Sequence, residues 1–167
     1  MDVHDKKTRS YNMSRIKGKD TKPEMLVRKY LFAHGFRYRL HVKALPGKPD
    51  IVLPKYKTVI FVHGCFWHGH NCPAFKWPKT REKFWREKIS TNRKRDIQQI
   101  NDLVRAGWRV SVVWECAIRS KAPEKLETFL RLLANWIEQR EIAAEESDEP
   151  SPLQVFPGGR DESTRSR

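Results

Sequence analysis

The sequence has few cysteines and no long apolar run. Only three cysteines occur among 167 residues, Cys65, Cys72 and Cys116. An odd set cannot pair completely in disulfides, so metal binding or simple burial of the thiols are the two interpretations. No apolar segment approaches the roughly 18 residues of a membrane span, and the first residues lack the apolar centre of a signal peptide. We therefore expect a soluble cytoplasmic protein without a membrane partner. The sequence has no apolar seam typical of an oligomer interface, so we expect a monomer.

Acidic residues are scarce relative to basic ones. The chain has 20 Asp and Glu against 34 Lys and Arg, a formal net charge of +14, and a sequence pI near 10.0. This balance favours polyanionic partners, either nucleic acid or an anionic membrane surface. Charge alone does not choose between them.

The chain divides into an arm, one domain and a tail. Residues 1–20 are polar and basic with almost no apolar periodicity, so we expect an arm without independent structure that orders on DNA. A single domain over residues 21–142 suits this length. The Glu-, Ser-, Pro- and Gly-rich residues 143–167 predict a disordered tail.

Apolar periodicity predicts a mixed α/β domain. Thr21 and Glu24 form a capping box that starts a helix over residues 22–34. Strands are predicted over 36–42, 51–53, 58–62 and 108–114. Residues 80–89 and 93–106 predict two helices or one kinked helix, and residues 123–141 a last helix. The order α-β-β-β-α-β-α implies a mixed sheet flanked by helices, with Asp50 opposite residues 61–63 in an antiparallel hairpin.

Metal-binding side chains gather after the third predicted strand. Cys65, His68, His70 and Cys72 fall within eight residues, and Cys116 follows the strand that ends at Trp114. Four sulfur and nitrogen ligands of this kind suit a closed, structural zinc site. The spacing leaves open which histidine is the fourth ligand, and burial of free cysteines remains the alternative.

Asp50 is the candidate for phosphodiester chemistry. It follows Pro49 at the start of an apolar strand, where a carboxylate has no packing role, and nucleases hold magnesium on such oxygens. A turn aspartate is the alternative. His63 and His68 flank the same strand end, and histidine can take a proton from water near neutral pH.

Aromatic residues interleaved with cations suggest contact with DNA. Phe66 and Trp67 lie in a polar loop that no strand or helix period orders, which favours stacking on bases. For Trp85 a core position is the equal alternative. Lys88 and Asn92 are one helical turn apart and would project together, a geometry suited to base edges.

Together these residues resemble the very short patch repair endonuclease family. The resemblance runs from about Val3 to Arg119 and is strongest in Leu-Pro-Gly-Lys-Pro-Asp50 and Phe-Val-His-Gly-Cys-Phe-Trp-His68. It implies a restriction-endonuclease-like core and a magnesium-dependent enzyme that nicks DNA beside the thymine of a T·G mismatch left by deamination of 5-methylcytosine. It also implies functional links to a cytosine-5 DNA methyltransferase and to a repair polymerase and ligase.

The resemblance also implies a role for each matched residue. Asp50 would bind magnesium together with the main-chain carbonyl of Val62, because no second carboxylate occurs in Val62-His63-Gly64. His68 would be the general base, His63 would assist at the scissile phosphate, and Glu24 would steady metal-bound water. The remaining matches are the zinc ligands Cys65, His70, Cys72 and Cys116, the aromatic wedge Phe66, Trp67 and Trp85, and the contacts to the mismatched pair, Lys88 and Asn92.

Two other functions fit the same residues. A non-catalytic, zinc-stabilised DNA-binding module would share the charge, the aromatics and the cysteines. A site-specific restriction-type nuclease would keep the chemistry but change the target. Binding assays do not separate the first alternative from an enzyme, since both predict salt-sensitive DNA binding.

Overall fold

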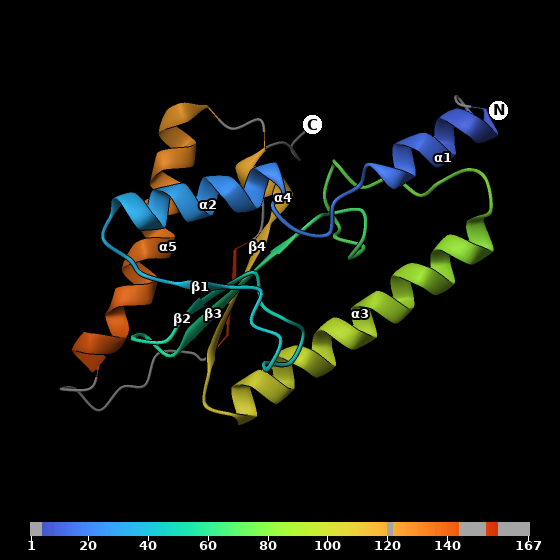
Figure 1. Cartoon of the computed structure of the whole chain (residues 1–167). Helices are drawn as coiled ribbons and strands as arrows, with labels where there is room; N and C mark the ends of the chain where they lie inside the picture. Colours follow the sequence, from blue (N-terminus) through green and yellow to red (C-terminus); the bar gives the residue numbers. More distant parts are fainter. Residues whose placement is uncertain (1–4, 120–121, 144–152, 157–167) are drawn as a thin grey trace, which may run out of the picture.

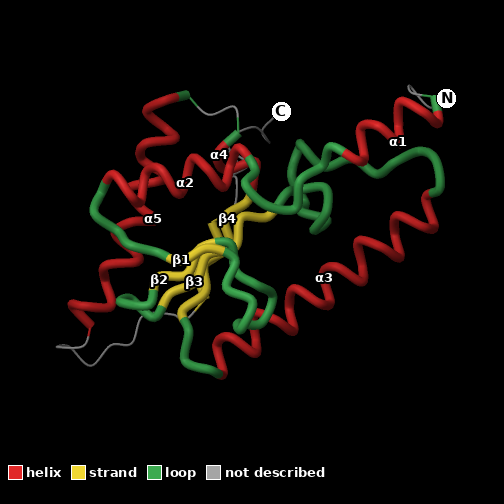
Figure 2. The backbone as a smooth tube through the Cα atoms, viewed as in Figure 1, coloured by secondary structure: helices red, strands yellow, loops and turns green. Residues whose placement is uncertain are grey.

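A five-stranded mixed sheet forms the centre of the molecule (Figure 2). The computed structural model describes residues 5–119, 122–143 and 153–156. The strands lie in chain order across the sheet: β1 (Arg39–Leu40), β2 (Ile51–Leu53), β3 (Thr58–His63), β4 (Arg109–Trp114) and β5 (Leu153–Phe156). The pairs β1–β2 and β2–β3 are antiparallel, whereas β3–β4 and β4–β5 are parallel. The predicted mixed α/β architecture is confirmed.

Helices cover both faces of this sheet (Figure 1). The helices are α1 (Lys6–Ser14), α2 (Lys22–Ala33), α3 (Glu82–Arg105), α4 (Glu115–Ile118) and α5 (Pro123–Ala143). Helices α2 and α5 lie on one face, and α3 crosses the other. This two-sided cover follows from strands that are apolar on both faces.

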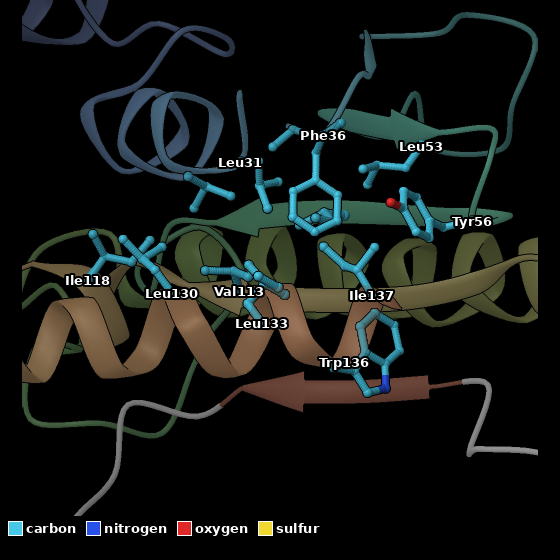
Figure 3. Packing of buried hydrophobic residues seen from close by; sticks show 14 residues of the cluster. Leu31, Phe36, Leu53, Tyr56, Val113, Ile118, Leu130, Leu133, Trp136 and Ile137 are labelled. Atoms are coloured by element: carbon cyan, nitrogen blue, oxygen red, sulfur yellow. The ribbon is translucent and has the colours of Figure 1, made fainter. Parts of the chain in front are cut away.

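Alternating side chains of β2 and β3 build two cores. Ile51, Leu53 and Ile60 pack towards α2 and α5 with Phe36, Leu133 and Ile137 (Figure 3). Val52, Val59 and Phe61 pack on the opposite face with Leu103 of α3. The period of two residues in a strand therefore anchors α3, whose other residues reach the site described below.

Local signals fix the helix boundaries as the sequence predicts. The Thr21 hydroxyl accepts a hydrogen bond from the Glu24 N–H, and the Glu24 carboxylate accepts one from the Thr21 N–H, so the capping box is present. Residues 82–105 form one continuous helix rather than two. Gly107, with φ of 80°, follows its end.

Four features differ from the sequence prediction. Residues 6–14 of the arm form α1, because the Asp5 carboxylate caps the first turn through the Thr8 N–H at 2.6 Å. The first strand shortens to Arg39–Leu40, since His41 adopts a left-handed φ of 48°. The short helix α4 was not predicted. Residues 153–156 of the predicted disordered tail form β5 beside β4, and the rest of that tail lies outside the described residues.

No helix in the described part of the chain is long and apolar enough to cross a membrane.

Candidate active site and metal cluster

The β2–β3 hairpin brings Asp50 to the end of β3. Ile51 pairs with Ile60, and the Val62 N–H donates a hydrogen bond of 2.7 Å to the Asp50 carboxylate. The proximity predicted from strand register is therefore confirmed. Asp50 and Val62 line an open cavity of about 780 Å³ that also includes Glu24, His63 and His68.

The environment of Asp50 disfavours an isolated negative charge. Burial raises the pKa of its carboxyl to about 6, and the hydrogen bond from the Val62 N–H opposes that rise only in part. The nearby Glu24 carboxylate raises the pKa further. A divalent cation held by oxygen ligands would relieve this cost, so the donor set fits magnesium at Asp50 and the Val62 carbonyl.

His63 and His68 form a stacked pair beside this carboxylate. Their ring centroids are 3.8 Å apart with an interplanar angle of 1°. Burial, followed by the neighbouring His68, lowers the pKa of His63 to about 3. His63 is therefore a neutral imidazole over the whole range in which DNA enzymes work, and can donate or accept a hydrogen bond without carrying charge.

Asp96 of α3 holds the second ring of this pair. Its carboxylate lies 2.5 Å from Nδ1 of His68. Burial acts to raise the pKa of Asp96, but the hydrogen bond from His68 and the charges around it more than offset burial, and the pKa is lowered. An ionised Asp96 accepts a hydrogen bond from the Nδ1–H of His68 and leaves Nε2 free to take a proton from water.

Sequence reasoning missed Asp96. The residue is 28 positions from His68, and only the docking of α3 against the sheet brings them together. A signal was available in α3, because Asp96 follows the singled-out Asn92 by four residues and so lies on the same helix face.

A network of charged side chains surrounds Glu24, which is 2 % exposed. The Glu24 carboxylate accepts from the Arg28 guanidinium and lies 3.1 Å from Nε2 of His41. Arg28 also donates to Asp20 at 2.7 Å, and Nδ1 of His41 lies 3.8 Å from the Asp50 carboxylate. Glu24 thus lines the cavity, but its carboxylate is already engaged by a cation. His41, Arg28 and Asp20 were not singled out from the sequence.

A second cluster contains all three cysteines. One ligand atom from each of Cys65, His70, Cys72 and Cys116 lies within 4.8 Å of the others. His70 Nδ1 and Cys116 Sγ are 3.4 Å apart, close to the roughly 3.5 Å edge of a tetrahedron built on Zn–S and Zn–N bonds. His68 is not in this set, because its ring faces His63 and Asp96.

Burial makes this cluster unfavourable for free thiolates. It raises the pKa of Cys65 to about 12, although a backbone hydrogen bond from Cys116 acts in the opposite direction. A zinc ion among these three thiols and the imidazole would supply the charge that stabilises thiolates. The donor set therefore fits zinc.

Gly69 lets the loop between the two clusters lie against α3. It has φ of 60°, and a Cβ there would lie 2.6 Å from Cγ2 of Ile89. Trp114, the last residue of β4, stacks on His70 at 4.1 Å and meets the ring of His63 edge-on at 5.4 Å. Trp114 therefore contacts both the metal-ligand cluster and the histidine pair.

The aromatic residues singled out as a wedge lie together. We call Phe66, Trp67 and Trp85 the aromatic cluster. The centroid of the Phe66 ring lies 5.2 Å from that of Trp67 and 5.2 Å from that of Trp85. All three are only partly buried, so the Trp85 side chain is not a core residue. Trp67 also lines the cavity that contains Asp50.

The two proposed base-contacting residues differ in exposure. Lys88 is exposed, whereas Asn92 is 6 % exposed. The Asn92 amide donates a hydrogen bond of 2.9 Å to the Trp67 carbonyl, and its oxygen accepts from Arg95 at 3.1 Å. In this structure Asn92 therefore supports the backbone of the aromatic cluster.

A partly buried carboxylate beside a paired histidine, in an open cavity of a strongly basic protein, fits the class of nucleases. The family model of DNA mismatch endonuclease Vsr matches residues 1–74. The chain is 47% identical over 136 residues to DNA mismatch endonuclease Vsr of Escherichia coli K12, covering 81% of this chain and 87% of that protein. It is 51% identical over 132 residues to type II nicking enzyme V.NmeAIP of Neisseria meningitidis, covering 78% and 94% respectively.

A third relative is type II nicking enzyme V.XorIIP of Xanthomonas oryzae, 50% identical over 110 residues, or 66% of this chain and 81% of the relative. The chain belongs to the DNA mismatch endonuclease Vsr family. The family assignment therefore makes this chain a nuclease.

Proposed function

We propose that this endonuclease nicks one strand of DNA next to the thymine of a T·G mismatch, in very short patch repair of deaminated 5-methylcytosine. The main observation behind this proposal is that catalytic candidates and an aromatic side chain line one cavity. Asp50, His63 and His68 line the same cavity as Trp67 of the aromatic cluster. A base pair opened by that cluster would lie beside the phosphate to be cut.

Asp50 and the main-chain carbonyl of Val62 would hold magnesium in a restriction-endonuclease-like core. Magnesium, when bound there, supplies positive charge that stabilises the pentacoordinate phosphate of the transition state. The raised pKa of Asp50 supports this role, because a cation would favour the ionised carboxylate. Glu24 is held by Arg28 and would position water at the cavity wall rather than bind metal directly.

His68 would act as the general base. Asp96 accepts a hydrogen bond from the Nδ1–H of His68. Nε2 of His68 then takes the proton from the water whose oxygen forms the new bond to phosphorus. The bond from phosphorus to the leaving oxygen breaks, and that oxygen receives a proton from solvent. His63, neutral and stacked on His68, would donate a hydrogen bond to a phosphate oxygen and keep the base in place.

Cys65, His70, Cys72 and Cys116 would hold a structural zinc. Four protein ligands leave no open position for substrate, so the zinc would stabilise the loop rather than react. Phe66 and Trp67 lie within this loop. Lys88 would contact the mismatched pair from α3, and Asn92 would support the Trp67 backbone. Residues 21–142 would form the endonuclease domain, with the basic arm docking on DNA.

A site-specific nickase is the second candidate function. The observation that favours it is that two of the similar proteins are named type II nicking enzymes. Such an enzyme would cut fully paired DNA at a particular sequence. Both candidates use the same catalytic residues and differ only in the substrate that the aromatic cluster accepts. A non-catalytic DNA-binding module is disfavoured by the endonuclease family of the chain.

End-labelled duplexes would separate these functions. The mismatch nickase predicts one nick, on the thymine strand, in a T·G duplex with magnesium and none in the matched T·A duplex. A panel of all mismatches in varied flanking sequences would define the preference. Equal cutting of T·G and T·A duplexes would favour the site-specific nickase, and intact DNA in every case would exclude both.

A further inference from the structure

A second cavity also borders the catalytic residues. It encloses about 820 Å³ and shares Asp50, Val62, His63 and His68 with the first cavity. Its volume is within the roughly 300–1,000 Å³ of typical ligand sites. The catalytic group thus borders both cavities, and Asp96 of the mechanism proposed above lines only the second.

Basic side chains line the outer part of this cavity. They are Lys19, Lys43, Lys48 and Arg95. Lys43 and Lys48 are exposed, and they flank the turn that leads into Asp50. The two acidic residues in the lining, Asp50 and Asp96, belong to the catalytic group. The cavity therefore places these cations near the catalytic carboxylates, an arrangement that can attract a phosphate chain.

The turn that carries Lys48 is fixed in an unusual conformation. Lys48 has a left-handed φ of 49°, and its N–H donates to the Leu45 carbonyl at 3.1 Å. A lysine in this region costs about 1 kcal/mol or more, which glycine or asparagine would lower. Lys57 has the same φ outside this cavity, so the conformation alone assigns no function, but it fixes Lys48 beside the cavity, two residues before Asp50.

Packing holds this turn against α3 and the sheet. Gly47 has φ of 73°, and a Cβ on it would lie 2.8 Å from Oε1 of Gln99 and 3.1 Å from the Phe61 ring. No side chain fits between the turn and these residues. The backbone next to Lys48 is therefore placed rigidly relative to α3, which also carries Asp96.

We propose that this second cavity binds the sugar–phosphate backbone of the cleaved strand on the side of the scissile phosphate away from the aromatic cluster, with Lys43 and Lys48 contacting its phosphates. The direction follows from the lining, since Trp67 lines the first cavity and is not among the residues of the second. The inference rests on the proposed function in that it requires a DNA strand across Asp50.

Lys48→Asn and Lys43→Gln test this inference, with Lys57→Asn as the matched control. Asparagine tolerates the left-handed conformation of Lys48, so the fold is retained. Lys57 has the same φ of 49° but lies in the β2–β3 turn, at the opposite end of the hairpin from Asp50. Affinity for a T·G duplex is measured by fluorescence anisotropy over a range of salt concentrations, without added divalent ions.

The double variant should bind about tenfold more weakly, and the slope of log affinity against log salt should fall by about 2. Lys57→Asn should leave both quantities unchanged. One uncharged methylphosphonate linkage is then moved along the cleaved strand. At positions away from the mismatch it should weaken binding by the wild-type protein and have much less effect on the double variant.

The inference would be overturned if the methylphosphonate weakened binding by the double variant as much as it weakens binding by the wild-type protein. It would also be overturned if the double variant bound like Lys57→Asn. Nicking of the T·G duplex by the wild-type protein, measured on the same samples, keeps the two proposals apart. If the wild-type protein nicks while the double variant binds normally, only the second cavity loses its role. If the wild-type protein fails to nick, the proposed function is contradicted, and the methylphosphonate coupling alone decides the role of the cavity.

Discussion

At the scale of single residues, the contacts of a side chain at this site, more than its residue type, determine its chemical role. Three histidines lie near Asp50, yet each has a different partner. His63 is buried and neutral, His68 is held by Asp96, and His41 lies between Glu24 and Asp50. Only one of the three, His68, has a carboxylate on one ring nitrogen and a place in both cavities. It is therefore the residue suited to proton transfer.

Asp50→Asn should stabilise the protein at neutral pH in the absence of magnesium. The pKa of Asp50 is about 6 in the folded state against an ordinary value of 3.8. The folded state therefore binds the proton more tightly, and stability falls as pH rises from about 4 to 6. Above that range the wild-type protein carries the full cost of the buried charge, roughly 2–3 kcal/mol. Asparagine removes it while still accepting from the Val62 N–H.

Thermal unfolding at pH 4 and pH 8, with and without magnesium, checks this expectation. The stabilising effect of Asp50→Asn should be present at pH 8 and small at pH 4. Magnesium should raise the melting temperature of the wild-type protein and leave that of Asp50→Asn unchanged. An equal magnesium effect on both proteins would contradict the assignment of Asp50 as the metal ligand.

Asp96→Asn should reduce the nicking rate far more than the affinity for DNA. Loss of the carboxylate that orients His68 leaves the imidazole without a fixed tautomer, which costs about 10²–10⁴-fold in comparable catalytic pairs. Single-turnover nicking and duplex affinity separate the two quantities. Asp102→Asn is the control on the same helix, where the carboxylate bonds to Gln98 at 2.8 Å. Equal rates for the two variants would remove Asp96 from the mechanism.

At the level of elements, the loop after β3 connects the two functional clusters. It runs from Gly64 to Arg81 between β3 and α3 and contains no regular element. Its order rests on the cysteine and histidine side chains, on Gly69 against α3, and on the aromatic contacts. A bound zinc would tie this loop to Cys116 after β4 and so add to its stability.

His70→Asn should therefore release zinc and destabilise the protein. Removal of one of four ligands opens the site, and structural zinc contributes on the order of 10–16 kcal/mol to folding in small domains. Metal analysis should find about one zinc per wild-type chain and less in the variant, with a lower melting temperature. His34→Asn, an exposed histidine at the end of α2, should change neither value. Zinc-free wild-type protein with the same melting temperature would exclude the structural role.

Trp67→Ala should weaken discrimination of the mismatch. Stacking of a base on an aromatic ring contributes about 1–3 kcal/mol, and Trp67 is the member of the aromatic cluster that lines the catalytic cavity. The affinity ratio of T·G to T·A duplexes should fall towards one. Trp77→Ala, an exposed tryptophan further along the same loop, is the control. A ratio that Trp67→Ala leaves at the wild-type value would rule out a wedge role for this side chain.

Elements defined by local chemistry could be predicted from the sequence, and those that depend on docking could not. The capping box of α2 and the β2–β3 hairpin follow from residues within a few positions of one another, and the hairpin register placed Asp50 beside Val62. The pairing of His68 with Asp96 depends on where α3 lies. The strand β5 depends on β4 as a partner, because four residues in a polar tail predict no stable strand by themselves even though Val155 and Phe156 favour one.

At the scale of the whole molecule, the net charge and the two cavities would act together on DNA. The net charge of +14 attracts any duplex, and this attraction weakens with salt without regard to sequence. Under the proposed function, selectivity would come from side chains that the hairpin and α3 bring together, with Trp67 beside one cavity and Lys43 and Lys48 beside the other. Composition predicted a polyanionic partner, and DNA is one. The proposed path of a strand across Asp50 could be inferred only from the three-dimensional structure.

The most direct test of the account is the nicking of an end-labelled T·G duplex with magnesium, beside its T·A counterpart. The account predicts a single nick next to the mismatched thymine, no cutting of the T·A duplex, and loss of the nick in Asp50→Ala. Equal cutting of both duplexes, or a nick that persists in Asp50→Ala, would contradict it.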